Sequence, residues 1–378
     1  MLDAAERLDL LVRVLSYNLD GQALSPLRAE LLSDLKSFEA MLLTASRRQL
    51  MPAAIDNLVA KGIVLPSEMM HGTQVGFLAQ VHKLNEGFQL RRNVLANSLK
   101  DIIAGLNGAG VEPLILKGSM SLISGEPAWR FQRDIDFTID PDESPATVRA
   151  LSDLGYSASK DSGARPHHLV PMLKEGLPAS IEPHVKLAGA RARKVLPDAA
   201  LLKYCHRGNW NGAKYSYLSP GASALHGLAH HHFQNRGYVF GTFSLKGLME
   251  FAHALSGMSN NEIIEMETVS HASVHLHAAM QVWCTLSSQV LNVTLPTTLS
   301  PSVAAIDYAA RLKNHFMTGT TGSPLSEAVA HATLLRAIST KLTLTGAFCS
   351  PLSDALHSAV WLDRAEQRRN ASGILADK

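Results

Sequence analysis

The stretch Leu114–Asp140, LILKGSMSLISGEPAWRFQRDIDFTID, decides how this chain can fold. It opens with a short apolar run, breaks at a Gly-Ser pair, and ends in a segment, residues 134–140, that alternates polar and apolar residues. Strict alternation is typical of a strand with one buried face, because successive strand side chains point to opposite faces of the sheet. We therefore expect the apolar residues of this segment in the core, with Asp134 and Asp136 side by side on the other face.

Two carboxylates placed this way repel each other unless a cation lies between them, and a hard divalent ion held by oxygen ligands is the usual solution. We expect Mg²⁺ at Asp134 and Asp136, with Mn²⁺ as the alternative. Gly118 and Ser119 come between the first strand and a helix, where backbone N–H groups, a hydroxyl and the helix dipole favour a phosphate. A phosphate site beside a metal site implies phosphoryl or nucleotidyl transfer.

A second alternating segment, Ser180–Leu187, adds a third acidic residue. Glu182 and His184 fall on its polar face. If this strand neighbours the first one, Glu182 completes a cluster of three carboxylates, and it can bind the metal, act as the general base, or do both. Pro183 cannot donate to a strand ladder, so it predicts an edge strand.

Three basic residues in the same region, Lys117, Arg130 and Arg133, are candidates to balance the charge of a triphosphate. Arg130 is the preferred candidate, because a guanidinium can contact phosphate oxygens through two parallel hydrogen bonds.

These residues resemble a known family. Leu116-Lys117-Gly118, then Arg130, then Asp134-Ile135-Asp136 are similar to the uncharacterised bacterial nucleotidyltransferases that carry LKG…R…DIDLLV, within the polymerase-beta-type nucleotidyltransferase superfamily. The later parts of that pattern have counterparts in the same order, so the resemblance spans about residues 90 to 255: Gly155-Tyr156, Pro166-His167-His168-Leu169, Ile181-Glu182-Pro183-His184 and Leu225 through His232.

The resemblance implies an α+β fold, in which a small mixed polymerase-beta-like sheet is flanked by large N- and C-terminal helical regions. It also implies an enzyme that moves a nucleoside monophosphate from an NTP to an acceptor hydroxyl and releases pyrophosphate. In that reading Asp134, Asp136 and Glu182 are catalytic and bind the metal. The nucleotide is then contacted by Lys117, Gly118, Ser119, Arg130, Arg133 and His184.

The chain departs from the family pattern at two positions. Glu182 stands where the related sequences have Asp, and the extra methylene moves the carboxylate oxygens by roughly a bond length. Catalysis is sensitive to misplacement of about 1 Å, so a nucleotide-binding or scaffolding protein that has lost turnover is the alternative function. The second departure is Lys246-Gly247-Leu248-Met249-Glu250, where the related pattern often has Trp-x-x-Asp.

Composition sets further limits on the chain. Its 378 residues carry 35 basic and 33 acidic side chains, a net charge of +2 that argues against an extended nucleic-acid groove. The three cysteines, Cys205, Cys284 and Cys349, are far apart and fit a reducing compartment. No apolar run approaches the roughly 20 residues that cross a bilayer, so we expect a cytoplasmic protein. The acceptor stays open among a small molecule, a protein side chain and an RNA end.

Helical periodicity on both sides of the alternating segments divides the chain into three parts. We expect an N-terminal helical region at 1–105, the nucleotidyltransferase core at 106–190, and a C-terminal helical domain at 191–378. In the last part His226 and His230 lie one helical turn apart, followed by His231 and His232. Core histidines or nucleotide contacts are the expected roles, since the sequence lacks the Glu of a His-Glu-x-x-His zinc motif; hydrolysis at a His-bound metal is the competing hypothesis.

Overall fold

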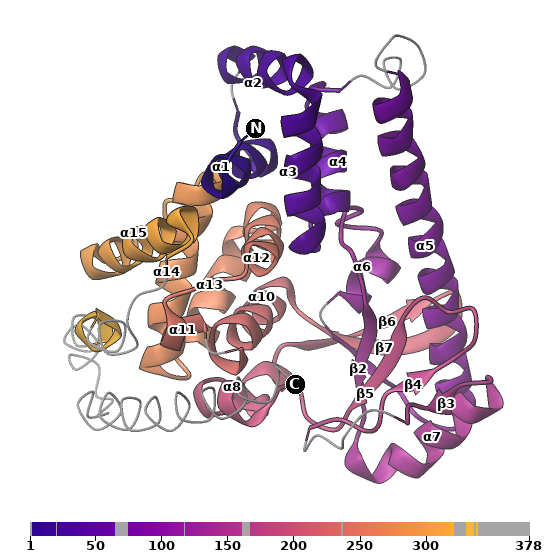
Figure 1. Cartoon of the computed structure of the whole chain (residues 1–378). Coiled ribbons are helices and arrows are strands. Elements are labelled where there is room, and N and C mark those ends of the chain that lie inside the picture. The colour runs from indigo at the N-terminus through magenta and orange to yellow at the C-terminus, as the bar shows by residue number, and fades with distance from the viewer. Residues whose placement is uncertain are drawn as a thin grey trace, which may run out of the picture.

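The computed structural model describes residues 2–19, 21–64, 75–116, 118–160, 167–235, 237–320, 330–335 and 338. Lys117 and Cys349 lie outside the described residues. The predicted α+β architecture is confirmed: a mixed sheet of seven strands within the described residues lies between helices from both ends of the chain (Figure 1).

Helices make up the first part of the chain, as the periodicity predicted. They are α1 (Ala4–Leu15), α2 (Gly21–Ser33), α3 (Leu35–Arg47), α4 (Met51–Ala60) and the long α5 (Val75–Gly108). The first helix begins at Asp3, whose carboxylate accepts the N–H groups of Ala5 and Glu6 while the Glu6 side chain accepts the N–H of Asp3. This capping box satisfies donors that the first helical turn cannot pair internally.

The strand order in the sheet is β3-β4-β5-β2-β1-β7-β6. Its members are β1 (Leu114–Ile115), β2 (Asp134–Thr138), β3 (Ser157–Ala158), β4 (Met172–Leu173), β5 (Ser180–His184), β6 (Cys205–Trp210) and β7 (Ala213–Leu218). The central strand β2 pairs antiparallel with β1 and parallel with β5. The two strands with alternating sequences are therefore direct neighbours.

The apolar face of β2 is buried as predicted, since Ile135 and Phe137 are fully inaccessible to solvent. They share a hydrophobic core with Ile181 of β5 and with α5 residues such as Leu99. The helices α6 (Ser119–Ser124) and α7 (Ser144–Asp153) and the 3₁₀ turn η1 (Pro141–Glu143) connect the strands on this side. The two aspartates lie on the opposite face of β2, which is the face of the candidate active site.

The prediction that Pro183 marks an edge strand is wrong. The strand β5 lies between β4 and β2. The Pro183 carbonyl accepts the N–H of Leu169, and the Leu169 carbonyl accepts a bond from the Nδ1 of His168. Proline has no N–H to donate to the Leu169 carbonyl, and the side chain of His168 donates to it instead, which explains how proline is tolerated inside the sheet.

The expectation of helices alone after residue 190 is also wrong, because β6 and β7 form a hairpin that joins the sheet beside β1. The residues of β6 are mostly half-buried or exposed, so no apolar alternation announces the strand. The turn signal was present nevertheless. Asn211 and Gly212 both have positive φ, at 53° and 92°, as the two-residue turn of an Asn-Gly hairpin requires.

The remaining helices pack as a bundle at the left of Figure 1. They are α8 (Ala190–Val195), α9 (Asp198–Leu202), α10 (Pro220–Ala229), the π-helical turn η2 (His230–Gln234), α11 (Gly237–Phe240), α12 (Leu245–Gly257), α13 (Asn260–Ser270), α14 (Val274–Leu291) and α15 (Val303–Thr318). Across the described residues, no helix has the length and apolar character needed to cross a membrane. The division of the chain into three domains stays a prediction.

Candidate active site

The parallel pairing of β2 with β5 brings two of the predicted acidic residues together. Asp136 is the direct partner of Glu182, and Thr138 is the partner of His184. Because side chains two residues apart in a strand share a face, Glu182 and His184 lie on the same side of the sheet as Asp136. One ligand atom from each of these three residues lies within 4.8 Å of the other two, a spacing that could hold a metal ion.

Asp136 is buried, and its contacts hold it in one orientation. Its Oδ1 lies 2.9 Å from the Nε2 of His184, and the two side chains are only 6% and 4% exposed. An ionised carboxylate only accepts hydrogen bonds, so the imidazole proton lies on Nε2 when Asp136 is charged. Within the described part of the chain, the Nδ1 of His184 has no hydrogen-bond partner.

Asp134 lies at the start of β2, is half-buried, and pairs with Ser180 rather than with an acidic residue. It does not belong to the three-residue group that could hold a metal among the described residues. The third member of that group is the imidazole of His184. The predicted role of Asp134 as a metal ligand stays a prediction.

The turn at Gly118 and Ser119 is bound tightly to the rest of the site. The Ser119 hydroxyl accepts the backbone N–H of Asp136 at 2.8 Å, and the Ser119 N–H donates to the Leu116 carbonyl at 3.1 Å. The Gly118 carbonyl accepts bonds from Ser121 and Gln132. These bonds fix the start of the six-residue helix α6 against the strand that carries Asp136.

Arg130 lies directly over this turn. A Cβ built on Gly118 would come within 2.5 Å of the guanidinium carbon, so only glycine allows so close an approach. Glu250 of α12 accepts hydrogen bonds from the Nε and Nη2 of Arg130 at 2.9 and 3.0 Å. Arg133, by contrast, is exposed.

The sequence assigned no role to Glu250, although it lies in the segment that replaces Trp-x-x-Asp. Burial by itself would raise the pKa of this carboxyl, but the charges of Arg130, Lys246 and His231 outweigh burial and hold the pKa below its usual value. Glu250 therefore stays ionised and orients Arg130. The two residues are 120 positions apart, so only the folded chain brings them together.

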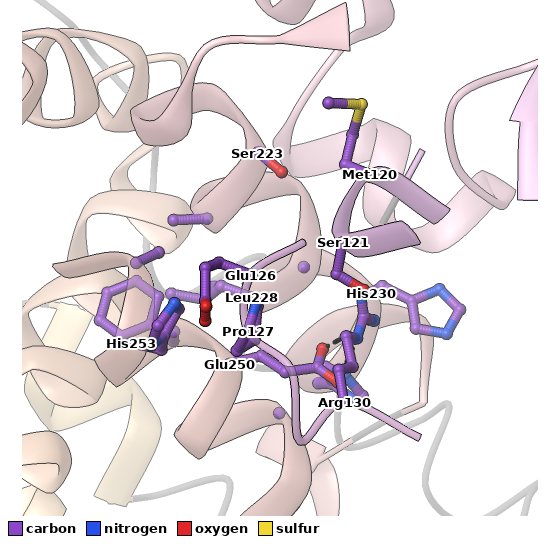
Figure 2. A pocket seen from close by; sticks show the side chains of 16 residues that line it. Met120, Ser121, Glu126, Pro127, Arg130, Ser223, Leu228, His230, Glu250 and His253 are labelled. Atoms are coloured by element: carbon purple, nitrogen blue, oxygen red, sulfur yellow. Dashed lines mark hydrogen bonds and ion pairs between the residues drawn. The ribbon is translucent and has the colours of Figure 1, made fainter. Parts of the chain in front are cut away.

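A cavity of about 180 Å³ adjoins this ion pair, between α6, the segment 126–130 and the helices α10 and α12. Figure 2 shows Arg130 beside Glu250 at one end and His253 beside Glu126 at the other. The remaining walls combine apolar side chains, such as Leu228, with histidines of the π-helical turn η2. The cavity thus combines apolar walls with a few charged and polar groups, a character typical of small-molecule sites.

The histidines of α10 and η2 have structural surroundings. His226 is buried and its Nε2 donates to the Leu187 carbonyl at 2.7 Å. His232 accepts a bond from the indole of Trp283 at 3.4 Å, and burial lowers the pKa of its imidazole to about 3. Neither belongs to the metal-capable group of the described residues, which agrees with the expected role of core histidines.

Two further histidines near the acidic group had no assigned role. The ring centres of His167 and His168 lie 5.8 and 5.3 Å from that of His184. His168 is buried, its Nδ1 donates to the Leu169 carbonyl, and its Nε2 has no partner among the described residues. Both histidines belong to the Pro-His-His-Leu segment that contributes to the family resemblance. That segment was the sequence signal from which their place near the site could have been predicted.

Comparisons with known proteins complete this description. A family model described as "Uncharacterised nucleotidyltransferase" matches residues 36–287. Among solved structures, the chain is similar to the antibiotic-resistance factor ANT(2'')-Ia, determined in solution, with 13% sequence identity over 46% of this chain and 89% of that one. The TM-score of 0.32 is too low for this similarity to carry an argument. A search of curated proteins finds no match.

Proposed function

Because this chain belongs to the uncharacterised nucleotidyltransferase family and is thus a nucleotidyltransferase, we propose that it moves a nucleoside monophosphate from an NTP to an acceptor hydroxyl and releases pyrophosphate. The observation that carries the proposal is the direct pairing of Asp136 with Glu182 on neighbouring parallel strands. Glu182 supplies a carboxylate next to Asp136 despite its longer side chain, which favours catalysis over the alternative of a protein that binds nucleotides without turnover.

The chemistry of the donor set fits a divalent cation. Asp136 and Glu182 offer oxygens within 4.8 Å of each other, close enough for both to contact one ion, and carboxylates are the ligands that Mg²⁺ and Mn²⁺ prefer in phosphate-transferring sites. We propose that Asp136 and Glu182 hold such an ion, with Asp134 at the start of the same strand as a further ligand. The bound ion supplies charge neutralisation to the triphosphate and a lower pKa to a nearby hydroxyl.

We propose that Glu182 also serves as the general base. In the proposed reaction its carboxylate takes the proton of the acceptor hydroxyl, the hydroxyl oxygen forms a bond to the α-phosphorus, and the bond from that phosphorus to the bridging oxygen breaks. Pyrophosphate leaves with the electron pair of the broken bond. Glu182 is only half-buried, so an incoming hydroxyl can reach it.

Arg130, Gly118 and Ser119 would receive the triphosphate. Glu250 accepts hydrogen bonds from the Nε and Nη2 of Arg130, so we propose that Nη1, which lies next to Gly118, donates to phosphate oxygens. Because Ser119 accepts a hydrogen bond from Asp136, its own hydroxyl proton remains available for a phosphate. Arg133, Lys117 and His184 stay in the proposal as nucleotide contacts.

A pyrophosphate-release assay tests the proposed reaction. Each of the four NTPs is incubated with the full chain, Mg²⁺ or Mn²⁺ and a fractionated cell extract as the source of acceptors, so that small molecules, proteins and RNA are separated. Asp136→Asn should release pyrophosphate at least about 100-fold more slowly than wild type. Asp142→Asn changes an exposed carboxylate in η1 and should match wild type.

Two outcomes would contradict the proposal. Equal rates for wild type and Asp136→Asn would reject the assignment of the site. NTP binding measured by calorimetry, without product from any acceptor fraction, would support the alternative of a nucleotide-binding protein that has lost turnover.

A further inference from the structure

The imidazole beside Asp136 points to the identity of the cation. We propose that the Nε2 of His184 is itself a metal ligand, and that the site therefore binds Mn²⁺ in preference to Mg²⁺. This inference rests on the proposed function and adds to it a nitrogen ligand and a metal preference; it assigns His184 to the metal instead of to the nucleotide.

The distances in the site suit one ion shared by both side chains. Ligand atoms about 2.1 Å from an ion and at right angles to each other lie about 3.0 Å apart. The Nε2 of His184 and the Oδ1 of Asp136 are 2.9 Å apart. An ion about 2.1 Å from both atoms would lie to one side of the line that joins them. Loss of the shared proton and a turn of the two side chains toward the ion would suffice, and the Glu182 carboxylate lies within reach of the same ion.

The surroundings of His184 also suit a ligand. When Nε2 binds an ion, the ring proton moves to Nδ1, which then needs an acceptor. The ring of His168 lies 5.3 Å away, centre to centre, and its Nδ1 already donates to a carbonyl. A neutral ring that donates through Nδ1 carries a lone pair on Nε2. Both this nitrogen and the Nδ1 of His184 are buried and without a partner in the described part of the chain.

A nitrogen donor discriminates between the two ions. Mg²⁺ takes oxygen ligands almost exclusively and keeps much of its water, whereas imidazole is a better ligand for transition metals, and affinity for such sites rises from Mn²⁺ onward. Between these two ions, a set of two carboxylates and one imidazole therefore favours Mn²⁺ over Mg²⁺. Burial of His184, which is 3% exposed, excludes water that could otherwise take its place.

Pulsed electron paramagnetic resonance of Mn²⁺ tests this ligand directly, without any activity measurement. The full chain is loaded with Mn²⁺, once unlabelled and once with ¹⁵N-histidine, so that an imidazole nitrogen on the ion changes its coupling pattern. We expect this coupling in wild type and in His206→Gln, which changes an exposed histidine of β6, and its loss in His184→Gln. Competition should show wild type binding Mn²⁺ at least about 10-fold more tightly than Mg²⁺, with a smaller ratio in His184→Gln.

Several results would overturn the inference. Bound Mn²⁺ without histidine coupling in wild type, or coupling that persists in folded His184→Gln, rejects His184 as a ligand. The labelled wild type decides the first point even if the variant fails to fold. Pyrophosphate release together with absent coupling would refute only this inference, whereas clear coupling without pyrophosphate release under any condition would refute only the proposed function.

Discussion

The ion pair between Arg130 and Glu250 can be tested by its effect on stability. The two side chains are 14% and 18% exposed and joined by two hydrogen bonds. Arg130→Met would leave the Glu250 carboxylate buried without its main partner. Removing one member of a buried ion pair costs about 3 to 5 kcal/mol. The charge of Lys246 also stabilises ionised Glu250, so we expect a loss near the lower figure.

Urea unfolding followed by circular dichroism measures this loss. A decrease of about 3 kcal/mol in the free energy of unfolding shifts the urea midpoint by about 1 M for a protein of this size. Arg133→Met is the matched control, because that arginine is exposed and should change the stability by less than about 0.5 kcal/mol.

A double-mutant cycle separates the pair from other effects of the substitution. Arg130→Met combined with Glu250→Leu removes both charges, so it should cost less than the sum of the single variants by at least about 2 kcal/mol. A loss below about 1 kcal/mol in Arg130→Met, or additive single effects, would refute the reasoning that this pair is effectively buried.

Three further predictions follow from the same site and core. Gly118→Ala places a Cβ 2.5 Å from the guanidinium carbon of Arg130, so urea unfolding should show a loss similar to that of Arg130→Met; wild-type stability would contradict the close packing. Ser119→Ala removes the acceptor of the Asp136 N–H and should cost about 1 to 3 kcal/mol; an unchanged urea midpoint would contradict this. Burial lowers the pKa of His277 from 6.5 to about 4, and a folded-state pKa below the unfolded one means that the unfolded chain binds the proton first. Stability should therefore fall by up to about 1.4 kcal/mol per pH unit from roughly pH 6.5 to pH 4, and His277→Gln should reduce that slope.

The sequence alone determined the local structure of the site. The alternation in residues 134–140 predicted a strand and its buried face, and Ile135 and Phe137 are buried. Side-chain direction in a strand depends only on the position along that strand, so a single segment contains the information. Helical periodicity likewise predicted helical structure in the region of α5, and the Gly-Ser pair predicted the turn before α6.

Two predictions from the sequence are wrong because contacts with other parts of the chain decide where a strand lies. Pro183 was assigned to an edge strand because proline has no N–H to donate. The side chain of His168 donates to the Leu169 carbonyl instead, and β5 lies inside the sheet. The hairpin of β6 and β7 was missed because the half-buried and exposed residues of β6 show no apolar alternation. In both cases the deciding contacts come from another segment of the chain.

Only the tertiary structure decided which residues meet at the site. The register of β2 against β5 places Asp136 opposite Glu182 and Thr138 opposite His184, which brings the imidazole of His184 to the Asp136 carboxylate. Packing of α12 against the segment after α6 pairs Glu250 with Arg130. Strand order, register and helix docking are set by interactions between segments distant in the chain, and such interactions leave no periodic pattern within any one of them.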